Sequence, residues 1–258
     1  MRLPVSIALL LLAISTFPAQ SVPTRVQNSR DRITITAKRA VLVRSGKWVD
    51  RFPERKRAIV TYPLVSGSTN PVVLRKVRSI LQLKNVFDSS LKEYRDNGWL
   101  TEFGYHVNYN KNFILDLTFT QSGMGAYLDE QSRHFLITLR DGSVIRPADV
   151  FVVAKLPQLQ AVVNEKFQTE LKEILERLKN SKSDPEDIRI ASEAQETLDY
   201  KSKDLDNFEV GVKGVTFLYD AGYPYVIRAF EPQGRYFFTY SQLKPYIKRD
   251  GPLGQFVQ

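Results

Sequence analysis

The chain has 258 residues, of which 37 are basic and 28 acidic, and it contains two histidines and no cysteine. The lack of cysteine excludes disulfides, a cysteine zinc site and a lipid-modified cysteine. The formal net charge of +9 favours anionic partners, such as a cell-wall polymer, anionic lipid or nucleic acid.

Residues 1–21 have the layout of a cleavable secretory signal. Arg2 precedes an apolar stretch, and the small residues Ala19 and Ser21 stand at the −3 and −1 positions of a cut after Ser21. The apolar stretch is too short for a normal membrane span, and no later segment approaches ~18 consecutive apolar residues. We therefore expect an exported chain, periplasmic or extracellular, with no transmembrane segment in its mature part. Export also argues against a nucleic-acid partner, although the mature charge is still +8.

Strand patterns dominate residues 22–66. Residues 22–54 contain an alternating strand, RITITAKRAVLV, followed by a basic loop. A second strand, AIVTYPLV, comes next. Because proline cannot donate to a ladder, Pro63 predicts that this strand ends there or lies at an edge.

The next segment has the periodicity of one long helix. Apolar residues recur at steps of three and four between Asn70 and Asn97. Asn70 can cap its start, Pro71 suits its first turn, and Asn97-Gly98 closes it.

Strands return after Gly98. The runs WLTEFGYHVNYN and FILDLTFTQ flank Asn110-Lys111-Asn112, a hairpin signal, and in the second run polar and apolar residues alternate. A further strand, RHFLITLR, ends in an Asp141-Gly142 turn. Between the last two strands, we expect Gly123 and Gly125 to hold backbone conformations that a side chain resists, so that the chain turns sharply. Tyr127 should begin or flank the next strand.

The C-terminal half adds a helix and more strands. An amphipathic helix is predicted at about Leu156–Lys179. Residues 180–206 are charged and weakly apolar, which indicates a mobile loop or a lone surface helix. Strands follow in FEVGVKGVTFLYD, YPYVIRAFEP and RYFFTY, and then a short helix capped by Ser241. Hairpins and the order of elements predict an α+β fold, an antiparallel sheet with two main helices packed on it.

Four stretches resemble the extracellular domain of the lysozyme-sensing anti-sigma factor RsiV. They span residues 55–250: TYPLVSGSTNPVV, FILDLTFTQSGMGAY, FLITLRDGSVIRPADVF, and GVTFLYDAGYPYVIRAF with FFTYSQLKPYI. The same domain type occurs N-terminal to the catalytic domain of certain secreted peptidoglycan deacetylases. The resemblance implies a binding domain for lysozyme or cell-wall glycan. The family's loop usually ends Gly-Ala-His, whereas Tyr127 stands here in place of the histidine, so that histidine's role is not carried over.

Motifs for catalysis and for cofactors are missing. No glycine stands two places before Ser122, so there is no Gly-x-Ser-x-Gly elbow, and no phosphate-binding glycine motif is present. His106 and His134 are too far apart in sequence for the His-x-x-x-His pair of a deacetylase metal site. The adjacent carboxylates Asp129 and Glu130 are interpreted as a solvated turn. We therefore predict a non-enzyme, and we identify no cofactor and no metal-ligating residues.

Aromatic and basic residues crowd the C-terminal part, as in many recognition surfaces, although strand alternation places about half of the aromatic residues in a core. The candidate binding residues are Tyr127, Arg228, Arg235, Lys244 and Lys248. The interpretation is an exported, non-catalytic binding module of the bacterial cell envelope, for an anionic cell-wall glycan or an envelope protein.

Two alternatives stay open, a lysozyme-binding or lysozyme-inhibiting protein and an accessory domain of an envelope hydrolase or deacetylase. Typical lysozymes are basic, so a domain of charge +8 would repel them unless its acidic residues cluster in one patch.

Overall fold

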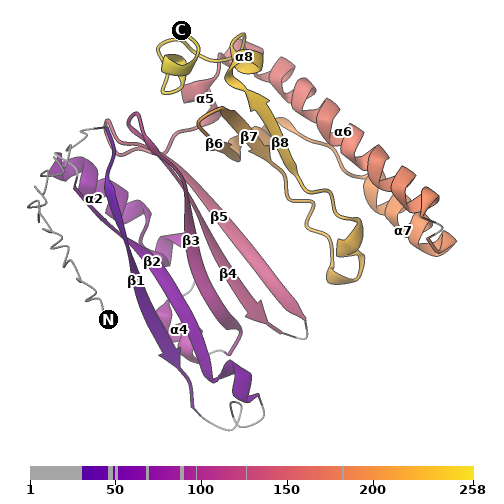
Figure 1. Cartoon of the computed structure of the whole chain (residues 1–258), viewed down its shortest axis with the longest axis horizontal. Coiled ribbons are helices and arrows are strands. Elements are labelled where there is room, and N and C mark those ends of the chain that lie inside the picture. The colour runs from indigo at the N-terminus through magenta and orange to yellow at the C-terminus, as the bar shows by residue number, and fades with distance from the viewer. Residues whose placement is uncertain are drawn as a thin grey trace, which may run out of the picture.

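The computed structural model describes residues 31–258 except 46–48, 50–51, 68–69, 88–89, 97, 126 and 182, so the predicted signal lies outside the described residues. Two β-sheets lie beside each other with helices on their outer sides (Figure 1). The strands are β1 Thr34–Val43, β2 Arg57–Ser66, β3 Leu100–Lys111, β4 Ile114–Met124, β5 Leu128–Thr138, β6 Phe208–Val210, β7 Gly214–Leu218 and β8 Arg235–Thr239. The α-helices are α2 Pro71–Ile80, α3 Leu83–Val86, α4 Leu91–Asp96, α5 Pro147–Val150, α6 Leu156–Asn180, α7 Pro185–Glu196 and α8 Tyr240–Leu243. Short 3-10 helices are η1 Pro53–Lys56, η2 Val153–Lys155, η3 Ser202–Asp206, η4 Tyr225–Phe230 and η5 Gly254–Phe256.

The larger sheet has the strand order β1-β2-β3-β4-β5, and the smaller has the order β6-β7-β8. All neighbouring strands are antiparallel except β2 and β3, which pair in parallel over only two residue pairs. This confirms the α+β fold. Strand β2 does not end at Pro63, which pairs with Ala37 of β1 at a level where β3 has already separated from β2.

Two hydrophobic cores hold the layers together, and β4 contributes to both. Leu115, Leu117 and Phe119 pack into the core shared with α2, α3 and α4. Ile114, on the opposite face of the strand, packs into the core shared with α6 and the smaller sheet. The alternation predicted from the sequence is therefore confirmed, and each face meets a different layer. Strand β1 is part of the same sheet, since its ten residues all pair with β2.

The single long helix predicted over residues 70–97 is wrong. Asn70 does cap α2, because its side-chain oxygen accepts hydrogen bonds from the backbone N–H groups of Val72 and Val73. The chain then leaves helical geometry at Gln82 and Phe87, which separate α2, α3 and α4. Val86 and Phe87 are buried in the core of the larger sheet. Tertiary packing of these side chains outweighs the helical periodicity.

Residues 180–206 contain a surface helix, α7, as one of the two predicted alternatives has it, but the segment is also anchored in the core. Ala191 of α7 is buried, and the short stretch after the helix places Tyr200 in the core at 0% exposure. The Tyr200 hydroxyl donates to the backbone oxygen of Asp204 (3.0 Å). A few well-placed apolar groups therefore anchor a segment whose composition is mostly charged.

Two further predictions in the C-terminal part are wrong. The segment predicted as the strand YPYVIRAFEP forms η4, which follows Pro224. The last α-helix is capped by Thr239 and not by Ser241, because the Thr239 side chain accepts from the N–H of Gln242. Strand β8 and α8 are thus continuous in sequence, which leaves no room for a separate cap at Ser241.

Arg44, at 4% exposure, follows the end of β1 and connects it by hydrogen bonds to α4, η1 and β3. Its guanidinium donates to the backbone oxygens of Tyr94, Arg55 and Leu100, at 2.6–3.1 Å. Burial lowers the pKa of this guanidinium below its usual value. The three backbone carbonyl groups thus supply the hydrogen-bond acceptors that a buried guanidinium needs in place of water.

Candidate functional site

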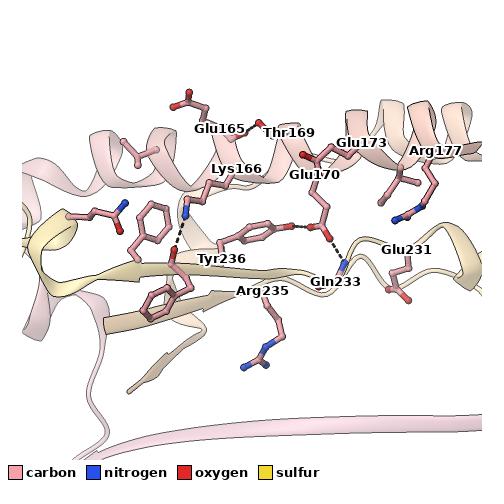
Figure 2. A pocket seen from close by; sticks show the side chains of 15 residues that line it. Glu165, Lys166, Thr169, Glu170, Glu173, Arg177, Glu231, Gln233, Arg235 and Tyr236 are labelled. Carbon is pink, nitrogen blue, oxygen red and sulfur yellow. Dashed lines mark hydrogen bonds between the residues drawn. The ribbon is translucent and has the colours of Figure 1, made fainter. Parts of the chain in front are cut away.

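A groove of about 750 Å³ runs between α6 and the outer edge of β8, and we call it the α6 groove (Figure 2). The buried stripe of α6 (Leu159, Val163, Phe167, Leu171 and Ile174) faces the smaller sheet. The residues that flank this stripe therefore form one wall of the groove, because helix residues three and four apart share a face. They include Lys166, Glu170, Glu173 and Arg177, and the other wall includes Glu231, Gln233, Arg235 and Phe237.

Glu170 and Lys166 tie α6 to β8. The Glu170 carboxylate accepts from the Tyr236 hydroxyl (2.8 Å) and from the N–H of Gln233 (2.7 Å) (Figure 2). Lys166 Nζ donates to the backbone oxygen of Phe237 (2.7 Å) and lies 4.2 Å from the centroid of the Phe238 ring. Burial, with a smaller contribution from Glu170, raises the pKa of Tyr236 well above its usual range. The groove is thus a defined surface with several of its polar groups already positioned.

A second hollow of about 680 Å³, the β5 cleft, lies on the other side of Gln233–Arg235. Its walls come from the start of β5 and from the segments around β7, η4 and β8. Four carboxylates line it, with two arginines among them: Asp129, Glu130, Asp220, Glu231, Arg228 and Arg235. Acidic residues that are far apart in sequence are therefore gathered here, in spite of the positive net charge of the chain.

The structure brings together only part of the predicted binding set. Arg228 and Arg235 both line the β5 cleft. Arg228 lies 3.7 Å from a carboxylate oxygen of Asp129, and Arg235 forms an ion pair with Glu209. Two acidic partners thus already engage the two arginines of the cleft.

The other three predicted binding residues lie elsewhere. Tyr127 is 57% exposed near the tip of the β4–β5 hairpin, and Lys244 is exposed after α8. Lys248 Nζ donates to the backbone oxygen of Ala148 (2.6 Å). Most of the C-terminal aromatic residues belong to the core: Tyr223, Tyr236, Phe238 and Tyr240 are buried, and Phe237 is the exception at 44% exposure. The structure therefore does not assemble one basic, tyrosine-rich patch from the predicted residues.

The two loop glycines differ from their predicted roles. Neither has the positive φ found at Gly142, so a left-handed conformation is not the reason for glycine at either position. Gly123 lies inside β4, and a Cβ atom there would overlap the indole ring of Trp99. Gly125 lies in the turn, where its N–H donates to the backbone oxygen of Tyr127 (3.0 Å). As predicted, Tyr127 directly precedes β5.

We expect Gly123→Val to lower the free energy of unfolding by about 1–3 kcal/mol, because its side chain must displace the Trp99 ring. Gly125→Val should change it by less than about 0.5 kcal/mol, since only a backbone oxygen at an ordinary 3.9 Å faces that position. Urea denaturation followed by circular dichroism measures both. Equal stability of the two variants would show that Trp99 does not constrain Gly123.

The main feature that sequence reasoning missed is a buried polar cluster around Asp116, which is 0% exposed. Its carboxylate accepts from Asn108 Nδ2 and His134 Nε2, each at 2.7 Å, and from the backbone N–H of Val210 in β6. Because a carboxylate only accepts, His134 must carry its proton on Nε2 for this bond. The cluster therefore joins the larger sheet to the smaller one. The alternation of β4 placed Asp116 on a polar face, but nothing local indicated that another layer covers it.

The two histidines lie in different surroundings. His134 is committed to Asp116, whereas His106 is exposed on β3 and pairs with Thr118 of β4. Neither lines the α6 groove or the β5 cleft. In the part of the chain that the structure describes, no group of three or more histidine, aspartate or glutamate side chains is arranged to hold a metal ion, and no helix could span a membrane.

The arrangement of helices and strands in this chain is similar to that of proteins of known structure. A member of the DUF3298 family from Bacteroides fragilis aligns with a TM-score of 0.54 at 12% identity, covering 90% of this chain and 98% of that chain. The fold of the present chain is therefore similar to that of DUF3298 proteins. A DUF3298 family protein from Pseudomonas aeruginosa gives a TM-score of 0.48 at 14% identity, covering 86% and 96% of the two chains. No family model matches the sequence, and no curated protein is similar to it.

DUF3298 proteins are related to the RsiV-like domain type, so the predicted resemblance is supported at the level of the fold. At these identities the DUF3298 likeness extends to the arrangement of helices and strands and not to ligands. The two hollows and their side chains are therefore the features of this chain that bear on ligand binding.

Proposed function

We propose that this protein is an exported, non-catalytic binding module of the bacterial cell envelope, which uses the face formed by the α6 groove and the β5 cleft. The observation that carries the proposal is that the two hollows adjoin and share Glu231, Gln233 and Arg235. Their charged groups are held by other protein groups, as Glu170 is by Tyr236 and Gln233. Such a face is suited to recognition, where complementary charges select a partner.

Two partners fit different parts of this face. An anionic cell-wall glycan would suit the positive net charge and the arginines of the cleft. A basic envelope protein, such as a lysozyme, would suit the four carboxylates of the β5 cleft, which form the acidic patch that such a partner requires. The clustering of carboxylates favours the protein partner.

A co-sedimentation experiment with purified cell-wall sacculi and a pulldown with lysozyme separate these partners. Replacement of Glu130 and Asp220, both exposed in the β5 cleft, by glutamine and asparagine should weaken lysozyme binding about tenfold or more. Joint replacement of Arg228 and Arg235, the two arginines of the β5 cleft, by glutamine should instead weaken binding to sacculi. Either attraction should fall as salt rises, because the Debye length shrinks from ~10 Å at 0.1 M to ~3 Å at 1 M.

The same preparations test the absence of chemistry. We expect no release of acetate or sugar when the protein is incubated with peptidoglycan. Release that depends on His106 or His134 would contradict a purely binding role. Failure to bind either sacculi or lysozyme at low salt would contradict the envelope-binding proposal itself.

A further inference from the structure

Strand β8 lies at the outer edge of the smaller sheet, and the hydrogen bonds to β7 fix which of its backbone groups face outward. The N–H of Tyr219 donates to Gly234 and the N–H of Tyr240 donates to Lys213, which marks both pairs as hydrogen-bonded pairs. In an antiparallel ladder, hydrogen-bonded and non-hydrogen-bonded pairs alternate. The backbone groups of Arg235, Phe237 and Thr239 therefore point away from β7, toward the edge that borders the α6 groove.

Side chains cover the two ends of this edge and leave its centre open. Glu170 accepts from the N–H of Gln233, Lys166 donates to the oxygen of Phe237, and the Gln242 side chain accepts from the N–H of Thr239. Among the described residues, no hydrogen bond is made to the N–H or the oxygen of Arg235 or to the N–H of Phe237. These three adjacent groups match what one added strand needs in order to pair.

From these groups we infer that the α6 groove binds an extended peptide segment of a partner protein, which lies between α6 and β8 and adds a strand to the smaller sheet. The groove volume of about 750 Å³ is within the usual range for ligand sites. The inference rests on the proposed function, since it specifies the partner of the same face.

The lining of the groove indicates which peptide fits. Toward α8 the walls are apolar, with Val162, Phe237 and Phe238. Toward η4 the carboxylates of Glu173 and Glu231 stand near Glu170 (Figure 2). The suitable segment therefore combines an apolar side chain at one end with a lysine or arginine at the other, because opposite charges across the interface favour binding.

The positive groups of the groove do not reverse this preference. Lys166 is held by the oxygen of Phe237, and Arg235 forms an ion pair with Glu209. That leaves Arg177, whose side chain makes no hydrogen bond or ion pair with the described residues. The carboxylates of Glu173 and Glu231 then outnumber it, and the acidic end of the groove is net negative.

The test uses the full chain and a short peptide with blocked ends that carries valines in one half and lysines in the other, to match the apolar and acidic ends of the groove. Three comparison peptides are the valine–glutamate version and two versions in which alternate amides are N-methylated, one in each phase. We expect the valine–lysine peptide to bind and to shift the amide NMR signals of Arg235 and Phe237. One phase of N-methylation should weaken binding about tenfold or more, since it removes the donors that face β8.

Variants of the protein give an independent reading. Phe237→Pro removes an N–H that faces away from β7, so the fold should tolerate it, as edge strands tolerate proline. It should weaken peptide binding about tenfold more than Phe237→Ala, which removes only the side chain. Joint replacement of Glu173 and Glu231 by glutamine should remove the preference for the lysine peptide. Thermal melts establish that each variant is folded.

Several outcomes would overturn the inference. Absence of binding by the valine–lysine peptide would do so, as would equal binding of both N-methylated versions. A dimer of the chain that Phe237→Pro dissociates and the peptide does not would assign the edge to a second copy. If lysozyme or sacculi bind while the peptide does not, only this inference fails; if the peptide binds while neither of them does, only the envelope proposal fails.

Discussion

Replacement of Asp116 by alanine should lower the free energy of unfolding by about 3–5 kcal/mol, which is a large part of the stability of a domain. The variant leaves two donors without an acceptor in the interior, His134 Nε2 and the N–H of Val210, while Asn108 Nδ2 keeps only its bond to Thr118 Oγ1. Each buried donor without a partner costs about 1–3 kcal/mol. Urea denaturation, monitored by tryptophan fluorescence and by far-ultraviolet circular dichroism, measures the loss.

The comparison with Glu130→Ala makes this result specific. Glu130 is an exposed carboxylate on β5, so its removal should change the free energy of unfolding by less than about 0.5 kcal/mol. Asp116→Asn should fall between the two, because an amide keeps one acceptor oxygen but adds donors to a site that already supplies three. Similar losses for Asp116→Ala and Glu130→Ala would mean that the cluster does not join the sheets energetically.

Alkaline solution should unfold the protein in a cooperative transition that begins above pH ~10. Burial raises the pKa of Tyr200, Tyr236 and Tyr240 well above the usual value, and it raises the pKa of Tyr223 to about 12. Below pH ~10 these hydroxyls are protonated in both the folded and the unfolded chain, so their contribution to stability is complete. Above it the unfolded chain releases protons that the folded chain retains, and stability falls until the folded pKa values are reached.

Each buried tyrosine should add a slope of up to about 1.4 kcal/mol per pH unit above pH ~10. Tyrosinate absorbance should therefore rise together with the loss of near-ultraviolet circular dichroism. Tyr240→Phe should make the dependence on pH shallower, since one of the titrating hydroxyls is removed, although the variant loses the hydrogen bond to the oxygen of Gly211. Tyrosinate absorbance that develops fully before any tertiary signal is lost would contradict the prediction.

Several elements of the fold could be predicted because local chemistry alone sets them. The hairpin predicted at Asn110–Asn112 forms, with its two-residue turn slightly later, at Asn112 and Phe113. Both turn residues have positive φ, as a tight turn between twisted strands requires. Helix α6 has almost the predicted bounds, because one apolar stripe continues through its whole length. The face on which Leu115, Leu117 and Phe119 lie also follows from the period of two residues in a strand.

The candidate site depends on contacts that no local pattern records. The sequence identified Arg228 and Arg235 as binding candidates by composition, and the fold then set each against an acidic residue, Asp129 or Glu209. The α6 groove exists because α6 lies alongside β8, the edge strand of the smaller sheet, although the two elements are about 70 residues apart in the chain.

Periodicity, turn residues and side-chain alternation act over a few neighbouring positions, and they therefore suffice to predict the α+β class, the long helix α6 and most strands. Which polar residues are buried depends instead on how distant segments pack against one another. In the sequence, Asp116 has the position of a solvent-facing residue in an alternating strand. In the structure it is buried, and its carboxylate accepts hydrogen bonds from His134 of β5 and from the N–H of Val210, 94 residues later. A buried charge is tolerated only where partners from other segments satisfy it, and the position of those segments is a property of the whole fold.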